Sequence, residues 1–222
     1  MNSYFRTVSP ELGDQWQPPP QPTRQRGRPS GFDRQTALEA AMRSFWAEGY
    51  EAASIDRLCR AMNMPRASLY QLFGDKQGLF LSALGRYGET RVSRVIAALG
   101  PKGTLAEDLS AFFDEVIYLA SSDRETPGCL ISCVLAEAAG TNPVFTVELD
   151  RRFVAMEKQI EARLQLAPWP ANAKIAPGAV AGMIASVARG MTLKARSGQT
   201  ADELKPVAQA AVTAVTSLSA AP

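Results

Sequence analysis

Hydrophobic residues recur at intervals of three and four along most of the chain after residue 32, which is the spacing of a buried stripe on an α-helix. The first stripe ends at Gly49 and consists of Ala37, Leu38, Ala41, Met42, Phe45 and Trp46. Later stripes are separated by turns that carry proline or glycine, and they predict helices over residues 55–62, 65–73, 76–99, 104–120, 128–139, 143–166, 176–195 and 202–218. Because no useful stretch alternates with a period of two, we predict an all-α fold.

The first 30 residues have a different composition. They hold six of the 15 prolines, set among polar residues without a hydrophobic period. Such a segment cannot bury enough apolar surface to fold, so residues 1–30 are predicted to form a disordered arm.

Two short predicted helices, 55–62 and 65–73, are joined by a turn of two or three residues, which is the length plan of a helix-turn-helix. Asn63 suits the turn because asparagine tolerates the left-handed conformation. The second of these helices is predicted to bury Leu69, Leu72 and Phe73.

The opposite face of that second helix is predicted to be polar. Ala67 and Gln71 face away from the buried side, Ser68 and Tyr70 flank them, and Arg66 begins the helix. Arginine and glutamine suit guanine and adenine edges, and hydroxyls suit phosphates. The bland alternative is an ordinary helical hairpin whose exposed polar residues bind nothing.

Charge is distributed unevenly. The chain carries a net charge of +2, but residues 24–94 hold 12 Lys and Arg against 7 Asp and Glu, whereas residues 95–222 hold 11 against 13. A basic N-terminal third favours a nucleic-acid partner. Chance clustering on solvated faces is the alternative explanation.

The run from Phe32 to Phe80, above all the segment ASLYQLFGDKQGLF, resembles the N-terminal domain of TetR-family transcriptional regulators. The resemblance implies a homodimer that binds palindromic double-stranded operator DNA through its third helix. A C-terminal domain would dimerise and hold a small-molecule effector. It also implies domains at 31–77 and 78–222. Residues carried over as groove contacts are Arg66, Ala67 and Tyr70, with Ser54 and Lys76 as phosphate contacts. Asn63 stands where the family usually has glycine, and Pro65 where Ser or Thr commonly caps the recognition helix.

Three arginines precede the first helix. Arg24, Arg26 and Arg28 lie in a segment that resembles the Arg-Gly-Arg-Pro core of an AT-hook. Extended arginines enter narrow A·T-rich minor grooves, so we expect the arm to add affinity for DNA. A solubilising tail is one alternative, and a non-specific AT-hook-like architectural protein is another.

The composition excludes several chemistries. The chain has no histidine, which excludes His-ligated zinc and nucleophilic triads with an imidazole base, and we expect no metal and no cofactor. Cys129 and Cys133 lie four residues apart and share a helix face. Core packing is the default role, and a redox or electrophile sensor acting through Cys129 is the alternative. A thiol enzyme is disfavoured because no base is placed beside either sulfur, so we expect no enzymatic activity.

The C-terminal half supplies candidates for an effector pocket and a dimer interface. An effector pocket needs aromatic and apolar residues, and candidates of this type include Phe112, Tyr118, Phe145 and Met156. The predicted effector contacts are Phe113, Cys129, Cys133, Phe153, Trp169 and Met183. The chosen dimerisation residues are Val187, Leu204, Val207, Ala211 and Val215, with an intrachain core as the alternative for the last helix. The chain starts without a secretory pattern and contains no apolar run long enough to span a bilayer, so we expect a cytoplasmic protein without a membrane partner.

Overall fold

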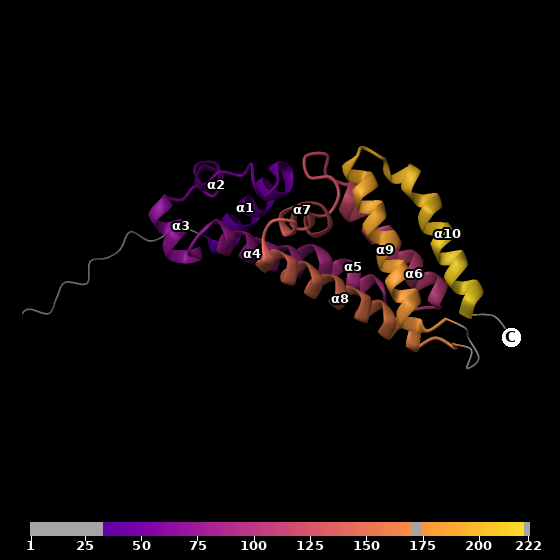
Figure 1. Ribbon diagram of the computed structural model, residues 1–222. Coiled ribbons are helices and arrows are strands. Elements are labelled where there is room, and N and C mark those ends of the chain that lie inside the picture. The colour runs from indigo at the N-terminus through magenta and orange to yellow at the C-terminus, as the bar shows by residue number, and fades with distance from the viewer. Residues whose placement is uncertain (1–32, 170–174, 220–222) are drawn as a thin grey trace, which may run out of the picture. The chain divides into compact units, whose positions relative to one another are not determined.

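The computed structural model describes residues 33–169 and 175–219, and over these residues the chain is helical with no strand (Figure 1). The all-α prediction is confirmed. The predicted arm, residues 1–30, lies outside the described residues.

The first three helices form a compact head. They are α1 (Arg34–Glu48), α2 (Ile55–Ala61) and α3 (Arg66–Phe73). Asp33 and Ser54 cap α1 and α2 by accepting hydrogen bonds from backbone N–H groups in the first turn. Phe45, Leu58 and Leu69 are fully buried where the three helices meet.

One side-chain prediction in the head is wrong. Leu72 was expected in the buried face of α3, but it is 46% exposed. The short α3 packs against α2 and α4, and its buried residues are Leu69 and Phe73, so Leu72 keeps nearly half of its surface in solvent. The amphipathic arc of α3 is therefore narrower than its sequence pattern indicates.

The helix predicted over 76–99 is continuous but not uniform. It consists of α4 (Lys76–Tyr87), the π-helical segment η1 (Gly88–Val92) and α5 (Ser93–Ala98). A π-helical turn adds one residue to the turn and rotates the side chains that follow it. The rod therefore begins beside α3 and changes its geometry at Gly88.

The remaining elements follow the predicted order. They are α6 (Leu105–Ser121), η2 (Leu130–Leu135), α7 (Ala136–Ala139), α8 (Pro143–Gln165), α9 (Pro177–Arg196) and α10 (Ala201–Ser219). Helix α9 packs against α8, and both α9 and α10 pack against α6 (Figure 1).

The buried apolar residues form two clusters. The first joins α1–α4 to the segment Cys129–Phe145, with aromatic contacts among Phe45, Phe80 and Phe145. The second joins α5, α6, α8, α9 and α10. The head thus packs against residues from the second half of the chain. The predicted domain boundary between residues 77 and 78 falls inside α4.

Candidate nucleic-acid interface and internal cavity

The outer face of α3 carries the polar set that the sequence predicted. Arg66, Ala67, Tyr70 and Gln71 are exposed, whereas Ser68 is half-buried. Leu69 and Phe73 on the opposite face are buried against α2 and α4. The local pattern therefore places one arginine, one amide and one phenol together on an open helical surface.

The turn before α3 has the conformation that Asn63 suggested. Asn63 has a φ of 49°, in the left-handed region that asparagine tolerates. Pro65 is the N-cap of α3, and its side chain offers no hydrogen bond to the first turn. The backbone N–H groups in the first turn of α3, which begins at Arg66, therefore receive no hydrogen bond from an N-cap side chain.

Arg66 pairs with an acidic residue from the preceding helix. Its Nε lies 2.9 Å from Oδ1 of Asp56, which stands in the first turn of α2. Both side chains are more than half exposed, so the pair contributes little to folding stability. Its effect is to orient the guanidinium at the edge of the exposed α3 face.

The two predicted phosphate contacts flank the head. Ser54 is exposed, and its hydroxyl already accepts a hydrogen bond from the backbone N–H of Arg57. Lys76 is half-buried, donates from Nζ to the carbonyl oxygen of Glu51, and lies 4.5 Å from the centre of the Tyr50 ring. Partial burial lowers the pKa of Lys76. Both remain predicted phosphate contacts. To bind a phosphate, Ser54 and Lys76 would have to keep or give up the hydrogen bonds that they already make within the protein.

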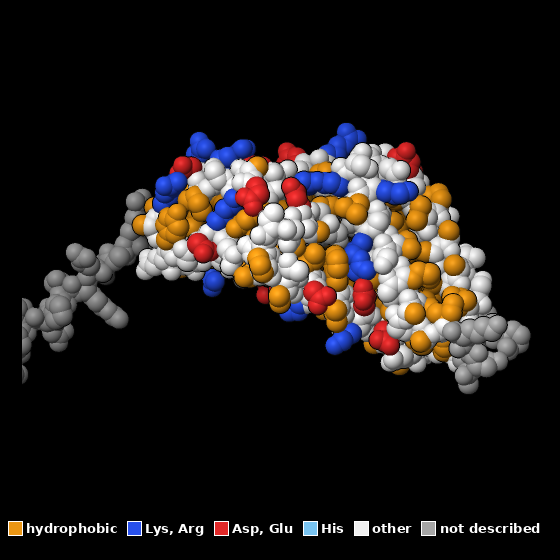
Figure 2. Space-filling model, in the orientation of Figure 1, with side chains coloured by type: hydrophobic (Ala, Val, Ile, Leu, Met, Phe, Trp, Pro, Cys, Tyr) orange, Lys and Arg blue, Asp and Glu red, His pale blue; other side chains and the backbone are white. Residues whose placement is uncertain are grey.

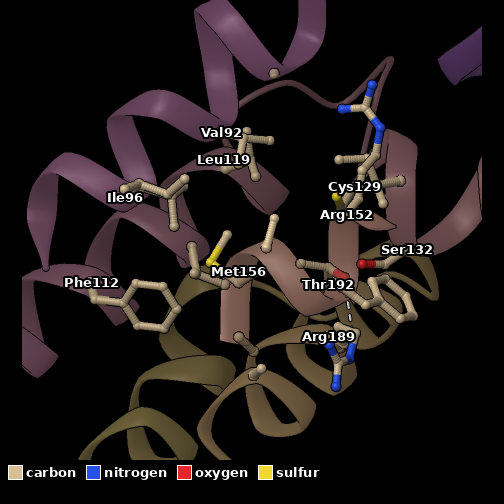
Figure 3. A pocket seen from close by; sticks show the side chains of 18 of the residues that line it. Val92, Ile96, Phe112, Leu119, Cys129, Ser132, Arg152, Met156, Arg189 and Thr192 are labelled. Carbon is tan, nitrogen blue, oxygen red and sulfur yellow. Dashed lines mark hydrogen bonds between the residues drawn. The ribbon is translucent and has the colours of Figure 1, made fainter. Parts of the chain in front are cut away.

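An internal cavity of about 250 Å³ lies between η1, α5, α6, η2, α8 and α9 (Figure 3). One end is apolar and is lined by Val92, Ile96, Phe112, Leu119 and Met156. The other end carries polar groups and is lined by Cys129, Ser132, Arg152, Arg189 and Thr192. A cavity of this kind suits a small molecule with an apolar body and a few polar groups.

Only part of the predicted effector set lines this cavity. Cys129 and Phe153 do. Phe113 is buried in the second core, and Cys133 packs against the first core. Trp169 donates to the carbonyl of Ile175, and Met183 is 41% exposed on α9. None of these four lines the cavity. Residue type alone could not separate core from cavity, because α-helical phase relative to neighbouring helices decides which side chain reaches the space.

Sequence reasoning did not predict three polar residues of the cavity, namely Ser132, Arg152 and Arg189. A faint signal existed for Arg189, because it interrupts the otherwise small and apolar run of α9. Arg152 and Ser132 carried no such signal. They become neighbours only when α8 and η2 pack against the same space.

Cys129 connects the cavity to the head. The Tyr87 hydroxyl donates a hydrogen bond to Sγ of Cys129, with 3.2 Å between Oη and Sγ, and the Tyr87 ring meets the Trp46 ring edge-on at 5.0 Å. Trp46 donates from Nε1 to the carbonyl of Pro127, and Arg196 donates from Nη1 to the carbonyl of Trp46. Burial raises the pKa of Tyr87 well above its usual range, so the phenol stays protonated as the donor.

The other two thiols are not activated by their surroundings. Burial raises the pKa of Cys59 and of Cys133, which favours the unreactive thiol form. In the parts of the chain that the structure describes, no group of three or more potential ligands is placed to hold a metal ion.

Two of the predicted dimerisation residues are wrong. Leu204 and Val215 are fully buried within this single chain, because the apolar stripe of α10 packs on α6 and α9. Val207 and Ala211 are half-buried against the same core, and Val187 is half-buried on α9. The intrachain alternative accounts for Leu204 and Val215, whereas Val187, Val207 and Ala211 remain predicted dimerisation residues. The exposed side of α9 instead carries Ala179, Met183 and Leu193, with open space around Gly182 and Gly190. Figure 2 shows that hydrophobic side chains reach the surface in the region of α9 and α10.

Comparison with known proteins decides the family. The family model for bacterial regulatory proteins of the tetR family matches residues 37–83. A relative from Bacillus subtilis, the HTH-type transcriptional regulator YezE, is 31% identical over 135 residues, which cover 61% of this chain and 68% of that protein. The chain belongs to the TetR family of transcriptional regulators. The TetR-family match coincides with α1–α4, the part that presents the polar face of α3.

Other TetR-family relatives extend over most of the chain. The HTH-type transcriptional repressor ComR of Escherichia coli is 29% identical over 188 residues, covering 82% of this chain and 89% of ComR. A cysteine mutant of the TetR-family regulator CifR, solved in complex with 26-base-pair operator DNA, superposes with a TM-score of 0.76 at 28% identity, covering 85% of this chain and 99% of CifR. Among the described helices of our chain, none is long and apolar enough to cross a membrane.

Proposed function

We propose that this TetR-family regulator represses transcription by binding a palindromic operator as a homodimer, and that a small molecule in the internal cavity releases it. The observation that carries the proposal is the open face of α3, where Arg66, Tyr70 and Gln71 project together beside a helix-turn-helix turn. The CifR complex with operator DNA supports the same use of the fold in a relative.

On DNA, α3 enters the major groove. Arg66 offers two terminal nitrogens to O6 and N7 of guanine, and Gln71 suits N6 and N7 of adenine. Ala67 allows close approach, while Tyr70, Ser68, Ser54 and Lys76 contact phosphates or base edges. Residues 31–77 form the DNA-binding domain, and residues 78–222 form the domain that binds the effector and dimerises. We expect the protein to act in the cytoplasm.

The dimer forms through the exposed side of α9. Ala179, Met183 and Leu193 recur along that side, and Gly182 and Gly190 leave space for a second backbone to approach. Exposed apolar stripes on a helix call for a partner. A two-fold axis between α9 and the α9 of a second copy gives the isologous contact that a palindromic site requires.

Release follows from the position of the cavity. Gly88 and Val92 line it from η1, the segment that continues α4, and Cys129 lines it beside Tyr87. A ligand that binds one arrangement of these groups more tightly shifts the population toward that arrangement. Because α4 contacts α3 at its other end, the shift changes the separation of the two recognition helices.

The test is binding of the purified full-length protein, at one stated salt concentration, to DNA flanking its own gene and to a scrambled duplex of equal composition. We expect one palindromic segment to be bound tightly, with two chains per site. Arg66→Ala and Gln71→Ala should weaken that binding by about tenfold or more each, while Gln209→Ala on the exposed side of α10 should not. Equal binding to both duplexes would instead support the AT-hook-like alternative.

A further inference from the structure

The internal cavity is asymmetric in a way that specifies the chemistry of its ligand. Figure 3 shows Ile96, Phe112, Val92 and Leu119 on one side of the space and Arg152, Cys129, Ser132 and Arg189 on the other. The ligand must therefore have an apolar body and one polar end, because an all-polar ligand would be desolvated against the first set.

The polar end carries one more positive charge than the protein neutralises. The charged side chains lining the cavity are Arg151, Arg152 and Arg189. Arg151 and Arg152 share a single carboxylate, since both donate to Glu148 at 2.7–2.8 Å. Arg189 pairs with Glu157 at 3.0 Å. Three guanidinium groups thus share two carboxylates, which leaves an excess of one positive charge. Arg151 is 64% exposed, so water screens its charge, whereas Arg152 is only 13% exposed and keeps its charge at the cavity wall.

Several donors at this end are free. Arg152 uses only Nε for Glu148, and Arg189 uses only Nη2, for Glu157 and Ser186. Within the described residues, neither Nη1 nor Nη2 of Arg152 donates a hydrogen bond, and the hydroxyl of Ser132 has no partner. Arg189 is also held in place, 4.4 Å from the centre of the Phe153 ring. Fixed, unused donors next to an uncompensated charge are the features of an anion site.

We propose that the cavity binds a monoanionic amphiphile, namely a carboxylic acid with an unbranched or aromatic apolar body. Its carboxylate accepts hydrogen bonds from the unused Nη1 and Nη2 of Arg152, Arg189 adds a second positive charge on the same side of the space, and its body extends toward Phe112 and Ile96. This inference rests on the proposed function of the cavity as the effector site. It adds the chemical class of the effector and the residues that select it.

Three probes of equal length and different head group test the class. Octanoate, octan-1-ol and octylamine are titrated into the full-length protein by isothermal calorimetry, without DNA. We expect octanoate to bind about tenfold or more tightly than octan-1-ol, and octylamine not to bind, because a charged hydrogen-bonded pair contributes more than a neutral one. Equal affinity for octanoate and octan-1-ol overturns the proposal, as does the absence of binding by all three.

Charge variants then test the residues. Arg152→Gln removes the excess charge and should lower octanoate affinity by about tenfold, whereas Glu157→Gln raises the excess and should increase it. Arg94→Gln is the matched control, since Arg94 also pairs with a glutamate, Glu115, but lies outside the cavity. Arg189→Gln removes the second positive charge and should lower octanoate affinity without affecting octan-1-ol, and it serves if Arg152→Gln fails to fold. An unchanged octanoate-to-octanol ratio in the folded variants rules the assignment out.

Operator binding is measured in parallel on the same preparations. Octanoate binding with failure to bind any palindromic DNA would reject the proposed repressor function and leave the cavity chemistry standing. Specific operator binding with no preference for octanoate would do the reverse. The two proposals are therefore tested separately.

Discussion

Nε of Arg66 lies 2.9 Å from Oδ1 of Asp56, and this ion pair joins the start of the recognition helix to the first turn of α2. The contact uses Nε, and the Arg66 side chain is 58% exposed. Nη1 and Nη2 form a donor pair that suits a bidentate contact with guanine. We expect Asp56 to position Arg66 for base reading, although its own charge is unfavourable beside phosphates.

Asp56→Asn should reduce specificity more than affinity. Without the carboxylate, Arg66 samples more orientations, so the ratio of operator to scrambled-duplex affinity should fall by about tenfold, while non-specific binding rises. Dissociation constants on both duplexes at one salt concentration measure this. Asp202→Asn, which removes an exposed pair with Lys205 on α10, is the control. An unchanged ratio in Asp56→Asn would show that the pair does not position Arg66.

Gly78→Ala should destabilise the head, whereas Gly85→Ala in the same helix should not. A Cβ at Gly78 would overlap the backbone carbonyl oxygen of Phe73, at the point where α3 and α4 meet. That overlap forces a backbone shift costing about 1–3 kcal/mol and displaces α3. Nothing lies within 4 Å of the corresponding position at Gly85, so alanine there should stabilise by about 0.5–1 kcal/mol. Urea unfolding of both variants decides the sign of each change.

The buried pair of Asp108 and Arg163 should make stability depend on acid pH. Their Oδ2 and Nε atoms are 2.7 Å apart. Burial tends to raise the pKa of Asp108, but hydrogen bonds from Arg163, Lys102 and Gly103 outweigh it and lower the pKa below its ordinary 3.8. The stabilisation is present above the unfolded-state pKa and is lost as the pH falls through the lower folded-state pKa.

Breaking this pair from one side should be costly. Asp108→Asn leaves the Arg163 charge buried without a partner, and the expected loss is about 3–5 kcal/mol. Denaturant titrations between pH 7 and pH 3 measure both effects. The variant should lose part of the acid sensitivity of the parent, and an identical pH dependence in the two proteins would contradict the assignment.

The thiols should react slowly in the native protein. Because burial raises the pKa of Cys59 and Cys133, their thiol–disulfide exchange at pH 7 should be many times slower than in urea and should accelerate as the pH rises. A time course with a chromogenic disulfide, repeated for Cys129→Ala, measures each class of thiol. Rapid modification of Cys129 accompanied by loss of operator binding would instead establish the thiol-sensor alternative.

Deleting residues 1–28 should weaken DNA binding and flatten its salt dependence. The three arginines Arg24, Arg26 and Arg28 lie in the deleted segment, and each neutralised phosphate adds about 0.9 to the slope of log affinity against log salt. Affinity for an A·T-flanked operator at several salt concentrations tests this. If the truncated and full-length proteins have the same slope, the arm is a solubilising tail.

The sequence by itself determined the helices and the reading head. Boundaries were correct to within a few residues because apolar spacing, the caps Asp33 and Ser54, and breakers such as Gly49 and Gly74 act over one or two turns. The conformation of Asn63 and the exposed set of α3 were also predictable, since both depend on neighbours within about ten residues.

Only the tertiary structure decided what each apolar face covers. Leu204 and Val215 belong to a stripe that fits an interface or a core equally well, and the position of α6 assigns them to the core. Leu72 keeps nearly half of its surface in solvent, because α3 packs against α2 and α4 with Leu69 and Phe73 as its buried residues. The charge excess at the cavity arises because Arg151 and Arg152 on α8 share Glu148, one turn away, while Arg189 on α9 pairs with Glu157, 32 residues away. The periodicity of the side chains predicts which face of a helix is apolar and which is polar. The segment that packs against each face is set by contacts between residues far apart in the sequence.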